Sequence, residues 1–143
     1  MQIGQLLRRK GGQVATIDGV RDVRSALALL AEHGIGALVV SSDGSRIDGI
    51  LSERDIARGI HEHGAELLAR PVSEVMTPGV HTCVPGATVT DLAQLMTDQR
   101  VRHVPVVEDG ALVGIVSIGD VVKARLDELE TERRQLVDYI QTV

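Results

Sequence analysis

The spacing of apolar residues predicts a helix followed by a strand in the first part of the chain. Four apolar residues fall at positions i, i+3, i+4 and i+7, on one face of a helix: Val23, Ala26, Leu27 and Leu30. Gly34 follows at a place where a glycine commonly ends a helix. The unbroken apolar run Ala-Leu-Val-Val at residues 37–40 is typical of a buried strand.

The same order of elements returns in the second half of the chain. The helical stripe is repeated by Val89, Leu92, Ala93 and Met96, and the apolar run by residues 104–107. The stretch GILSERD at 49–55 is matched by GIVSIGD at 114–120, and an Asp-Gly dipeptide typical of a hairpin turn precedes each, at 43–44 and 109–110. With short first strands expected at about 14–17 and 80–84, each copy has the order β-α-β-β-α. The chain is therefore predicted to be an α/β protein that contains two copies of one unit.

Each copy alone would be too small for a stable core, so we expect the two to pack sheet to sheet. We place the first repeat, with an N-terminal lead-in, at residues 1–66 and the second repeat at residues 67–126. The linker at about 62–79 contains a short helical segment at 65–69 and then leads into the second copy. Pro105 lies inside the second apolar run and predicts an edge strand or a strand start, because proline has no N–H to donate.

Residues 120–142 are highly charged and free of glycine and proline, which predicts a long C-terminal helix with residues 127–143 as an extension beyond the repeats. An apolar stripe recurs at heptad spacing, interrupted by Arg133: Val122, Leu126, Leu129, Leu136, Ile140 and Val143. Two interpretations remain open. The stripe covers the protein's own core, or it pairs with the same helix of a second chain. We favour pairing in a homodimer, because the helix is longer than the repeat requires.

Composition narrows the classes of ligand and partner. Aromatic residues make up 1% of the chain, and Tyr139 is the only one, so a ring-shaped ligand would be held by aliphatic side chains and backbone. The net charge of −5 and the lack of aromatic stacking platforms argue against a nucleic-acid partner. The one basic cluster, Arg8-Arg9-Lys10, is either a solvated helix end or an anion contact.

Cysteine content and hydropathy indicate where the protein works. Cys83 is the only cysteine, so no internal disulfide forms, as suits a reducing cytosol, and its simplest role is that of a small core residue. No apolar run approaches the roughly 20 residues that span a bilayer. The N-terminal stretch MQIGQLLRRKGG lacks the apolar segment of a signal peptide. We expect a soluble, cytoplasmic protein with no membrane partner.

The repeated Ser-x-x-Asp pattern, at Ser52–Asp55 and Ser117–Asp120, has two interpretations. In the structural one, serine caps a helix and the acid three residues later completes the cap. In the functional one, the helix start binds an anion, the serine hydroxyl contacts phosphate or sugar, and the aspartate accepts both hydroxyls of a ribose. The preceding glycine, Gly49 or Gly114, would then let a ligand approach the strand backbone.

Two β-α-β-β-α repeats that each end in Gly-h-h-Ser-x-x-Asp, where h is an aliphatic residue, resemble a CBS domain pair, also called a Bateman module. The stretches VSEVMTPGVHTCVPGATV and RVRHVPVVEDGALVGIVSIGDVVK are similar to that family, and the resemblance covers roughly residues 1–126. It implies a protein that binds AMP, ADP, ATP, NAD(H) or S-adenosylmethionine in clefts between the repeats. It also implies a dimer that regulates partners and catalyses nothing itself.

The resemblance further implies which residues would form the site. Ribose hydroxyls would be held by Asp55 and Asp120, with Ser52 and Ser117 beside them. The adenine edge would meet backbone groups at Thr16, Ile17, Thr82 and Cys83. Phosphates would contact Arg102 and His103, near Pro105, with added positive charge from Arg54 and Lys10. The first copy has Gly36 and Ala37 where the second has Arg102 and His103, so we expect unequal clefts.

Two other classes of function remain open beside the nucleotide sensor. In one, the protein is a structural dimerisation module whose clefts bind nothing and whose motifs only cap helices. In the other, it is an enzyme or metal protein, for which His61-Glu62-His63 is the only dense cluster of potential ligands. Alternate residues on a helix end diverge, and no serine or cysteine lies in a recognisable nucleophile setting.

We therefore expect no enzyme activity, no metal and no catalytic cofactor. The expected ligand is an adenine nucleotide, with AMP first and ADP, ATP or NAD(H) as alternatives. The expected partners are a second copy of the chain and a regulated protein on a separate polypeptide, because the sequence shows no second domain.

Overall fold

The computed structural model of the protein describes residues 1–142, so Val143, the last position of the predicted heptad stripe, lies outside the described residues. The helices are α1 (Ile3–Lys10), α2 (Val23–His33), α3 (Glu53–His63), the 3₁₀ helix η1 (Gly64–Ala69), α4 (Val72–Val75), α5 (Val89–Gln99) and α6 (Ile118–Thr142). The strands are β1 (Thr16–Ile17), β2 (Ala37–Val40), β3 (Gly49–Ser52), β4 (His103–Glu108) and β5 (Ala111–Ser117).

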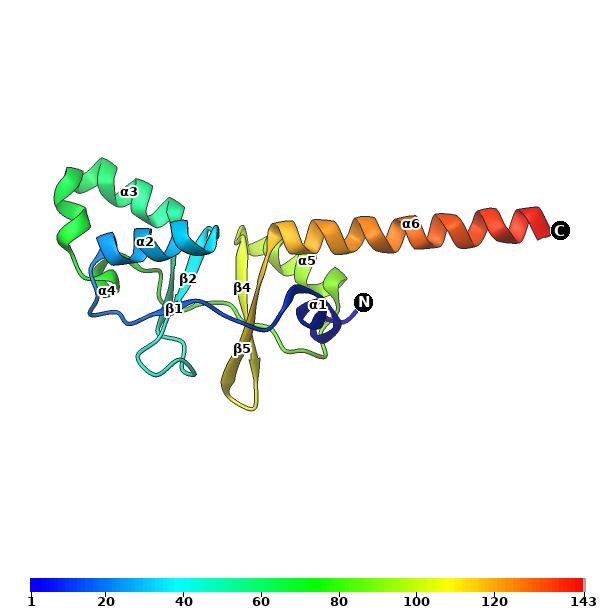
Figure 1. Cartoon of the computed structure of the whole chain (residues 1–143), viewed down its shortest axis with the longest axis horizontal. Coiled ribbons are helices and arrows are strands. Elements are labelled where there is room, and N and C mark those ends of the chain that lie inside the picture. Colours follow the sequence, from blue (N-terminus) through cyan, green and yellow to red (C-terminus); the bar gives the residue numbers. More distant parts are fainter. Residues whose placement is uncertain (143) are drawn as a thin grey trace.

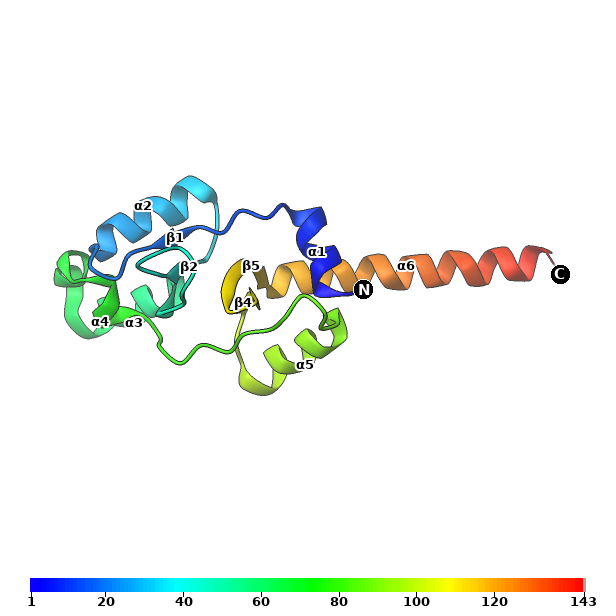
Figure 2. The ribbon, with the colours of Figure 1, turned by 90° about the horizontal axis from the view of Figure 1, so that it is seen from below.

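The two repeats lie next to each other, with the strands in the middle and the helices towards the two ends (Figure 1). In the first sheet β1 pairs with β2 in parallel and β2 pairs with β3 in antiparallel orientation, and in the second β4 and β5 are antiparallel. Helices α2, α3 and α4 lie on the side of the first sheet, whereas α1, α5 and α6 lie on the side of the second, as the turned view confirms (Figure 2). The predicted fold class is confirmed.

The predicted helices form where the apolar periodicity placed them, and each starts with a side-chain cap. Asp22 accepts the Ser25 N–H at 2.8 Å at the start of α2, and Thr88 accepts the Asp91 N–H at 3.0 Å at the start of α5. Gly34 ends α2 with a φ of 62°, a left-handed conformation that favours glycine. The stripes face two separate cores, with Val23, Ala26 and Leu30 buried in the first and Val89, Leu92 and Met96 in the second.

The segments that precede each repeat pack into the other repeat's core. Helix α1 lies against the second repeat, where Ile3, Leu6 and Leu7 join the buried cluster of that repeat. Its backbone is fixed there by hydrogen bonds from the Ile3 N–H to the Ala87 carbonyl at 2.8 Å and from the Gly4 N–H to the Pro85 carbonyl at 2.9 Å. The linker segments η1 and α4 pack in the same way into the first core. Neither core is therefore made from one continuous stretch of chain.

The expectation of a strand at about 80–84 is wrong. The segment contacts β4 only at an isolated parallel bridge between Cys83 and Val106. In the first repeat the Val39 N–H donates to the Ala15 carbonyl, which helps to extend β1. Pro105 occupies the position that matches Val39 and has no N–H, so the second repeat lacks this hydrogen bond. The expectation that Pro105 marks an edge strand is confirmed, because β4 pairs in its sheet with β5 alone.

The two hairpins differ in their turns. Asp109 and Gly110 have φ angles of 52° and 78° between β4 and β5, as the tight two-residue turn of a hairpin requires. The first hairpin does not turn at Asp43–Gly44 alone, as expected, but through a wider loop from residue 41 to residue 48. The Asp43 carboxylate organises that loop by accepting the Ser45 and Arg46 N–H groups, both at 2.8 Å.

The glycines that begin the two repeated motifs do not make room for a ligand, so that expectation is wrong. A Cβ at Gly49 would lie 2.7 Å from Met76 Sδ and 2.8 Å from the Thr77 carbonyl oxygen. A Cβ at Gly114 would lie 2.6 Å from Leu7 Cδ2. Both glycines are therefore required by the close approach of a lead-in segment.

The predicted C-terminal helix is confirmed as α6, which has 25 residues and extends well past the rest of the molecule (Figure 1). Its buried residues, Val121 and Ala124, lie near its start and face the second core. Among residues 1–142, no helix combines the length and the hydropathy that crossing a membrane would take.

Candidate functional site

The first Ser-x-x-Asp motif forms a complete cap at the start of α3. The Ser52 Oγ accepts the Asp55 N–H at 3.2 Å, and the Asp55 Oδ2 accepts the Ser52 N–H at 2.9 Å. The Ser52 hydroxyl also donates to Asp55 Oδ2 at 3.0 Å. These contacts fix the carboxylate at the junction of β3 and α3, where it is half-buried and reachable from solvent.

Thr77 from the linker completes the surroundings of the Asp55 carboxylate. Its hydroxyl donates to Asp55 Oδ1 at 3.1 Å. The Thr77 backbone pairs with Ile50 of β3 through two hydrogen bonds, of 2.8 and 3.0 Å, so the residue is held rigidly at the sheet edge. Oδ1 of Asp55, the oxygen that does not take part in the cap, therefore lies beside the linker segment that leads into the second repeat.

A cavity of about 380 Å³ opens between the two repeats at this point. The first repeat contributes the end of β3 and the first turn of α3, and the second contributes the segment before Thr82 and the start of β4. Fifteen residues line the cavity: Gly36, Ile50, Ser52, Glu53, Arg54, Asp55, Arg58, Thr77, Gly79, Val80, His81, Arg100, Val101, Arg102 and His103. The cavity thus joins residues that lie far apart in the sequence.

The charged side chains of the lining are mostly cationic. Arg54 and Arg58 come from α3, and Arg100 and Arg102 come from the end of α5 and the start of β4. The acidic residues of the lining are Glu53 and Asp55, so guanidinium groups outnumber carboxylates by four to two. Such a surface favours an anion that reaches beyond Asp55.

His103 faces Gly36 across the cavity. A Cβ at Gly36 would lie 3.6 Å from His103 Nε2 and 3.2 Å from Glu53 Oε1, so the small residue leaves space for both side chains. Burial lowers the pKa of His103. The positive charges of Lys10 and Arg102 lower it further, whereas the carboxylates of Asp120 and Glu53 raise it by less. The imidazole is therefore neutral at neutral pH, when it can both donate and accept a hydrogen bond.

The second Ser-x-x-Asp motif forms the same cap but meets a different neighbour. The Ser117 N–H donates to Asp120 Oδ2 at 2.8 Å, and the Asp120 N–H donates to Ser117 Oγ at 3.1 Å. The Lys10 ammonium also donates to Asp120 Oδ2 at 2.7 Å and to the Ile115 carbonyl at 2.8 Å. Asp55 thus meets a neutral hydroxyl where Asp120 meets a cation.

The electrostatics of Asp120 follow from that contact. Burial acts to raise its pKa, but the hydrogen bond and charge of Lys10, with the Ser117 N–H, outweigh burial and hold the pKa below its usual value. The lysine ammonium is thus bound to an ionised carboxylate at neutral pH. A second groove, of about 390 Å³, lies beside Asp120 between α1 and the start of α6, and Arg9, Lys10, Lys123 and Asp127 are among the residues that line it.

The structure brings some of the predicted site residues together and separates others. The cavity gathers Gly36, Ser52, Arg54, Asp55, Arg102 and His103. Lys10, Ser117 and Asp120 form the second cluster. The predicted residues that line neither place are Thr16, Ile17, Ala37, Thr82, Cys83 and Pro105. Ile17, Ala37 and Pro105 are instead buried in the strands.

Sequence reasoning missed the cavity residues contributed by the lead-in to the second repeat. Thr77 and Gly79 end the linker and Val80 and His81 follow it, and all four line the cavity beside the first repeat's helix start. The bridge between Thr77 and Ile50 is a contact between segments 27 positions apart, which no local pattern encodes. Arg100 was also missed, although its position after α5 matches the glycine that ends α2.

Cys83 lies half-buried against the second core, as a small core residue would. Burial raises the pKa of its thiol to about 11, which keeps the thiol protonated and unreactive. Within residues 1–142, no three side chains of His, Cys, Asp or Glu lie close enough together to hold a metal ion.

Two stretches of the chain, residues 3–62 and residues 72–127, match the same family model, described as the CBS domain. The chain belongs to the CBS domain family. Its two matches correspond to the two repeats of the fold, so the protein contains a CBS pair. CBS pairs are regulatory modules.

The CBS pair is similar to curated proteins and to solved structures. It is 40% identical over 123 residues to CBS domain-containing protein CBSX3, mitochondrial, of Arabidopsis thaliana, covering 83% of this chain but 60% of that protein. It is 36% identical over 108 residues to CBS domain-containing protein YhcV of Bacillus subtilis, covering 76% of each. The crystal structure of ATU1752 from Agrobacterium tumefaciens shares the fold with a TM-score of 0.84 at 42% identity, covering 87% of this chain and 99% of that one.

Proposed function

We propose that this CBS pair is a regulatory protein that binds an adenine nucleotide in the cavity at Asp55 and signals the bound state to another protein. AMP is the first candidate ligand, and ADP, ATP and NAD(H) are the alternatives. The observation that carries the proposal is the cavity itself, where a capped carboxylate of one repeat faces Arg102 and His103 of the other. The protein would regulate a reaction rather than catalyse one.

Asp55 is suited to hold the ribose. Its carboxylate is an acceptor of several hydrogen bonds, and the cap leaves the side toward Thr77 accessible. Two vicinal hydroxyls of a ribose would donate to these oxygens, either beside the Thr77 hydroxyl or in its place. An ionised carboxylate accepts hydrogen bonds and donates none. Asp55 would therefore bind the hydroxyl groups of a nucleoside in preference to an inorganic anion.

The arginines are suited to neutralise phosphate. Arg102 would meet the phosphate from the second repeat, while Arg54 and Arg58 approach from the first turns of α3. Guanidinium groups bind phosphate through paired N–H donors, and their charge raises affinity most where water is partly excluded. A neutral His103 would add a directional hydrogen bond.

The base would be held without aromatic stacking, as the composition requires. Ile50, Val80 and Val101 supply aliphatic surface in the lining, and the backbone at Gly79–His81 offers polar groups to an adenine edge. The cavity of about 380 Å³ lies near the lower end of the range of ~300–1,000 Å³ for small-molecule sites. That size favours a mononucleotide over the larger NAD(H).

A solved structure of the same fold supports the choice of ligand class. The CBS domain pair of protein MJ0100 is described in complex with 5′-methylthioadenosine and S-adenosyl-L-methionine, with a TM-score of 0.79. Its identity of 23% shows likeness of fold alone, so the proposal depends on the residues of the Asp55 cavity.

A calorimetric titration with AMP, ADP, ATP and NADH in turn tests the proposal, on protein stripped of carried-over nucleotide. We expect saturable binding of about one AMP per chain, because Lys10 already donates to Oδ2 of the Asp120 carboxylate in the second motif. Asp55→Asn should weaken binding by about tenfold or more, equivalent to ~1.4 kcal/mol. Asp91→Asn is the matched control, since Asp91 completes the same kind of cap on α5 outside the cavity.

Equal affinity of the Asp55→Asn and Asp91→Asn proteins would contradict the assignment of the site. The absence of binding by all four nucleotides would instead favour a structural dimerisation module. The complete caps at both motifs favour that second function, because they give each serine and aspartate a structural role without any ligand.

A further inference from the structure

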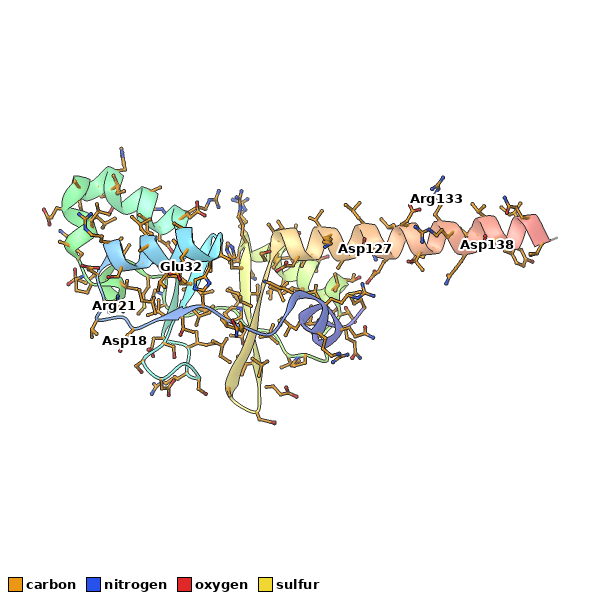
Figure 3. All side chains as sticks on the ribbon, in the orientation of Figure 1. Asp18, Arg21, Glu32, Asp127, Arg133 and Asp138 are labelled. Atoms are coloured by element: carbon orange, nitrogen blue, oxygen red, sulfur yellow. The ribbon has the colours of Figure 1, made fainter. Side chains whose placement is uncertain are left out.

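Among residues 1–142, the outer part of α6 packs against no other element. The outermost tertiary contact described along the helix joins the N-terminal ammonium of Met1 to Glu128 Oε1 at 2.9 Å. From Leu129 to Thr142 every residue is exposed, and the ion pairs of this part, such as Arg133 with Glu130 at 3.6 Å, lie within the helix. Figure 3 shows Arg133 and Asp138 on this projecting part, far from the two repeats.

This exposed helix carries an apolar stripe that is interrupted once, by Arg133. Its members along the helix are Val122, Leu126, Leu129, Leu136 and Ile140, with side chains 49–71% exposed. Once Arg133 is included, the spacing alternates between four and three residues, so the pattern repeats every seven residues, as is typical of a left-handed coiled coil. The family model ends at residue 127, so most of the stripe lies beyond the CBS pair.

A free helix of this length would be marginally stable alone. Residues 129–142 span about 21 Å at ~1.5 Å per residue, and isolated helices shorter than ~12–15 residues are marginal in water. An apolar stripe on such a helix stabilises it when a second helix covers the stripe. The described part of the chain offers no such helix, so the cover must come from another chain.

We propose that the outer halves of two α6 helices pair in parallel as a two-stranded coiled coil between two copies of this chain. The pairing does not depend on nucleotide binding. In heptad terms, the d positions are Val122, Leu129 and Leu136, and the a positions are Leu126, Arg133 and Ile140. The stripe of one copy can pack against the stripe of the other, because both copies have the same alternation of a and d positions along the helix.

Charge complementarity favours the parallel orientation. In parallel register Arg125, at g, faces Glu130 of the second copy, at e. Arg133 at the central a position lies next to Glu132 of the second copy, so the buried cation gains a partner. The antiparallel alignment that sets Arg133 against Leu129 would bring the two Glu130 side chains together, and likewise the two Glu132 side chains. The polar residue at one a position fixes the register at some cost in stability.

Disulfide trapping of the full-length chain tests this pairing, with Cys83→Ala as the background so that no other thiol reacts. Leu136→Cys places a thiol at a d position, where two parallel helices bring the side chains together. Thr131→Cys is the matched control, because residue 131 is also exposed but lies on the opposite side of the helix. In a glutathione redox buffer we expect Leu136→Cys to form a covalent dimer at least tenfold more completely than Thr131→Cys.

Equal cross-linking of the two variants, or none in either, would overturn the proposal. The mass of the unmodified chain in solution gives a second reading, since pairing requires a dimer. A dimer in which Leu136→Cys does not cross-link would overturn the parallel arrangement. A chain that stays monomeric would overturn self-pairing altogether and leave the stripe for a helix of another protein.

Discussion

Lys10 and Thr77 make the two Ser-x-x-Asp motifs chemically different. Both aspartates complete a cap, but Asp55 accepts a hydroxyl from Thr77 whereas Asp120 accepts the ammonium of Lys10. The Lys10 ammonium binds Oδ2 of Asp120 through a charge-assisted hydrogen bond and also donates to the Ile115 carbonyl, so a ligand at Asp120 would meet a fixed cation beside the carboxylate. The two repeats therefore have the same backbone pattern and unequal sites.

Lys10→Met should lower the free energy of unfolding at pH 7 by ~1 kcal/mol or less, because the ion pair is partly exposed. The folded-state pKa of Asp120 lies below the ordinary value of 3.8, so its stabilisation is present above that value and is lost as the pH falls through the folded pKa. At a pH below 3.8 the difference between Lys10→Met and the unchanged chain should therefore be smaller than at pH 7. Urea unfolding at both pH values measures it.

Lys123→Met is the control for that experiment, because Lys123 lines the same groove with no ion pair among the described residues. It should change stability little at either pH. A Lys10→Met effect of the same size at both pH values would show that the lysine stabilises by packing rather than by charge.

At the scale of elements, a single proline decides the difference between the two sheets. β1 pairs with β2 over two residues, whereas its counterpart in the second repeat is reduced to the bridge at Cys83. The Cys83 N–H still donates to the Pro105 carbonyl at 3.0 Å, so the segment lies in strand-like register. What the second repeat lacks is the amide donor at position 105.

Pro105→Val should restore that donor and extend the segment into a short strand, because the new N–H would point to the His81 carbonyl as Val39 does to Ala15. We expect slow hydrogen exchange at the amide of residue 105, comparable with that of Val39. Exchange at the rate of an unprotected amide would show that the neighbouring Pro85, and not Pro105, interrupts the strand.

At the scale of the whole molecule, the crossed lead-in segments connect the repeats. Helix α1 begins the chain but belongs to the second core, and α4 belongs to the first. The chain therefore passes between the repeats twice, and the Asp55 cavity lies beside one of these crossings, at Thr77. A ligand there would contact both repeats and the connecting segment, which gives a route from binding to a change in their relative placement.

Ile3→Ala should destabilise the protein by ~2–5 kcal/mol, because Ile3 is fully buried in the second core. Hydrogen exchange should become faster at Val104 and Val116 of that core than at Leu38 and Leu51 of the first. Ile60→Ala is the control, since its side chain is 42% exposed and should cost about 0.5 kcal/mol or less. Equal loss of protection in both repeats would mean that the cores unfold as one unit.

The sequence by itself determined the duplication, the helices, their caps and the long α6. These features follow from local spacing, since apolar periodicity selects a helix or strand and a Ser-x-x-Asp pattern caps the helix that follows it. Pro105 also carried a local signal, because its missing N–H limits pairing wherever the strand lies.

Only the tertiary structure decided which residues meet. The contacts between Asp55 and Thr77, between Lys10 and Asp120, and between Gly114 and Leu7 join segments that are 22 to 110 positions apart. Gly49 and Gly114 show the difference most clearly, because the sequence indicates close approach at a glycine but not whether a ligand or another part of the chain approaches. That depends on long-range packing, which spacing along the chain does not encode.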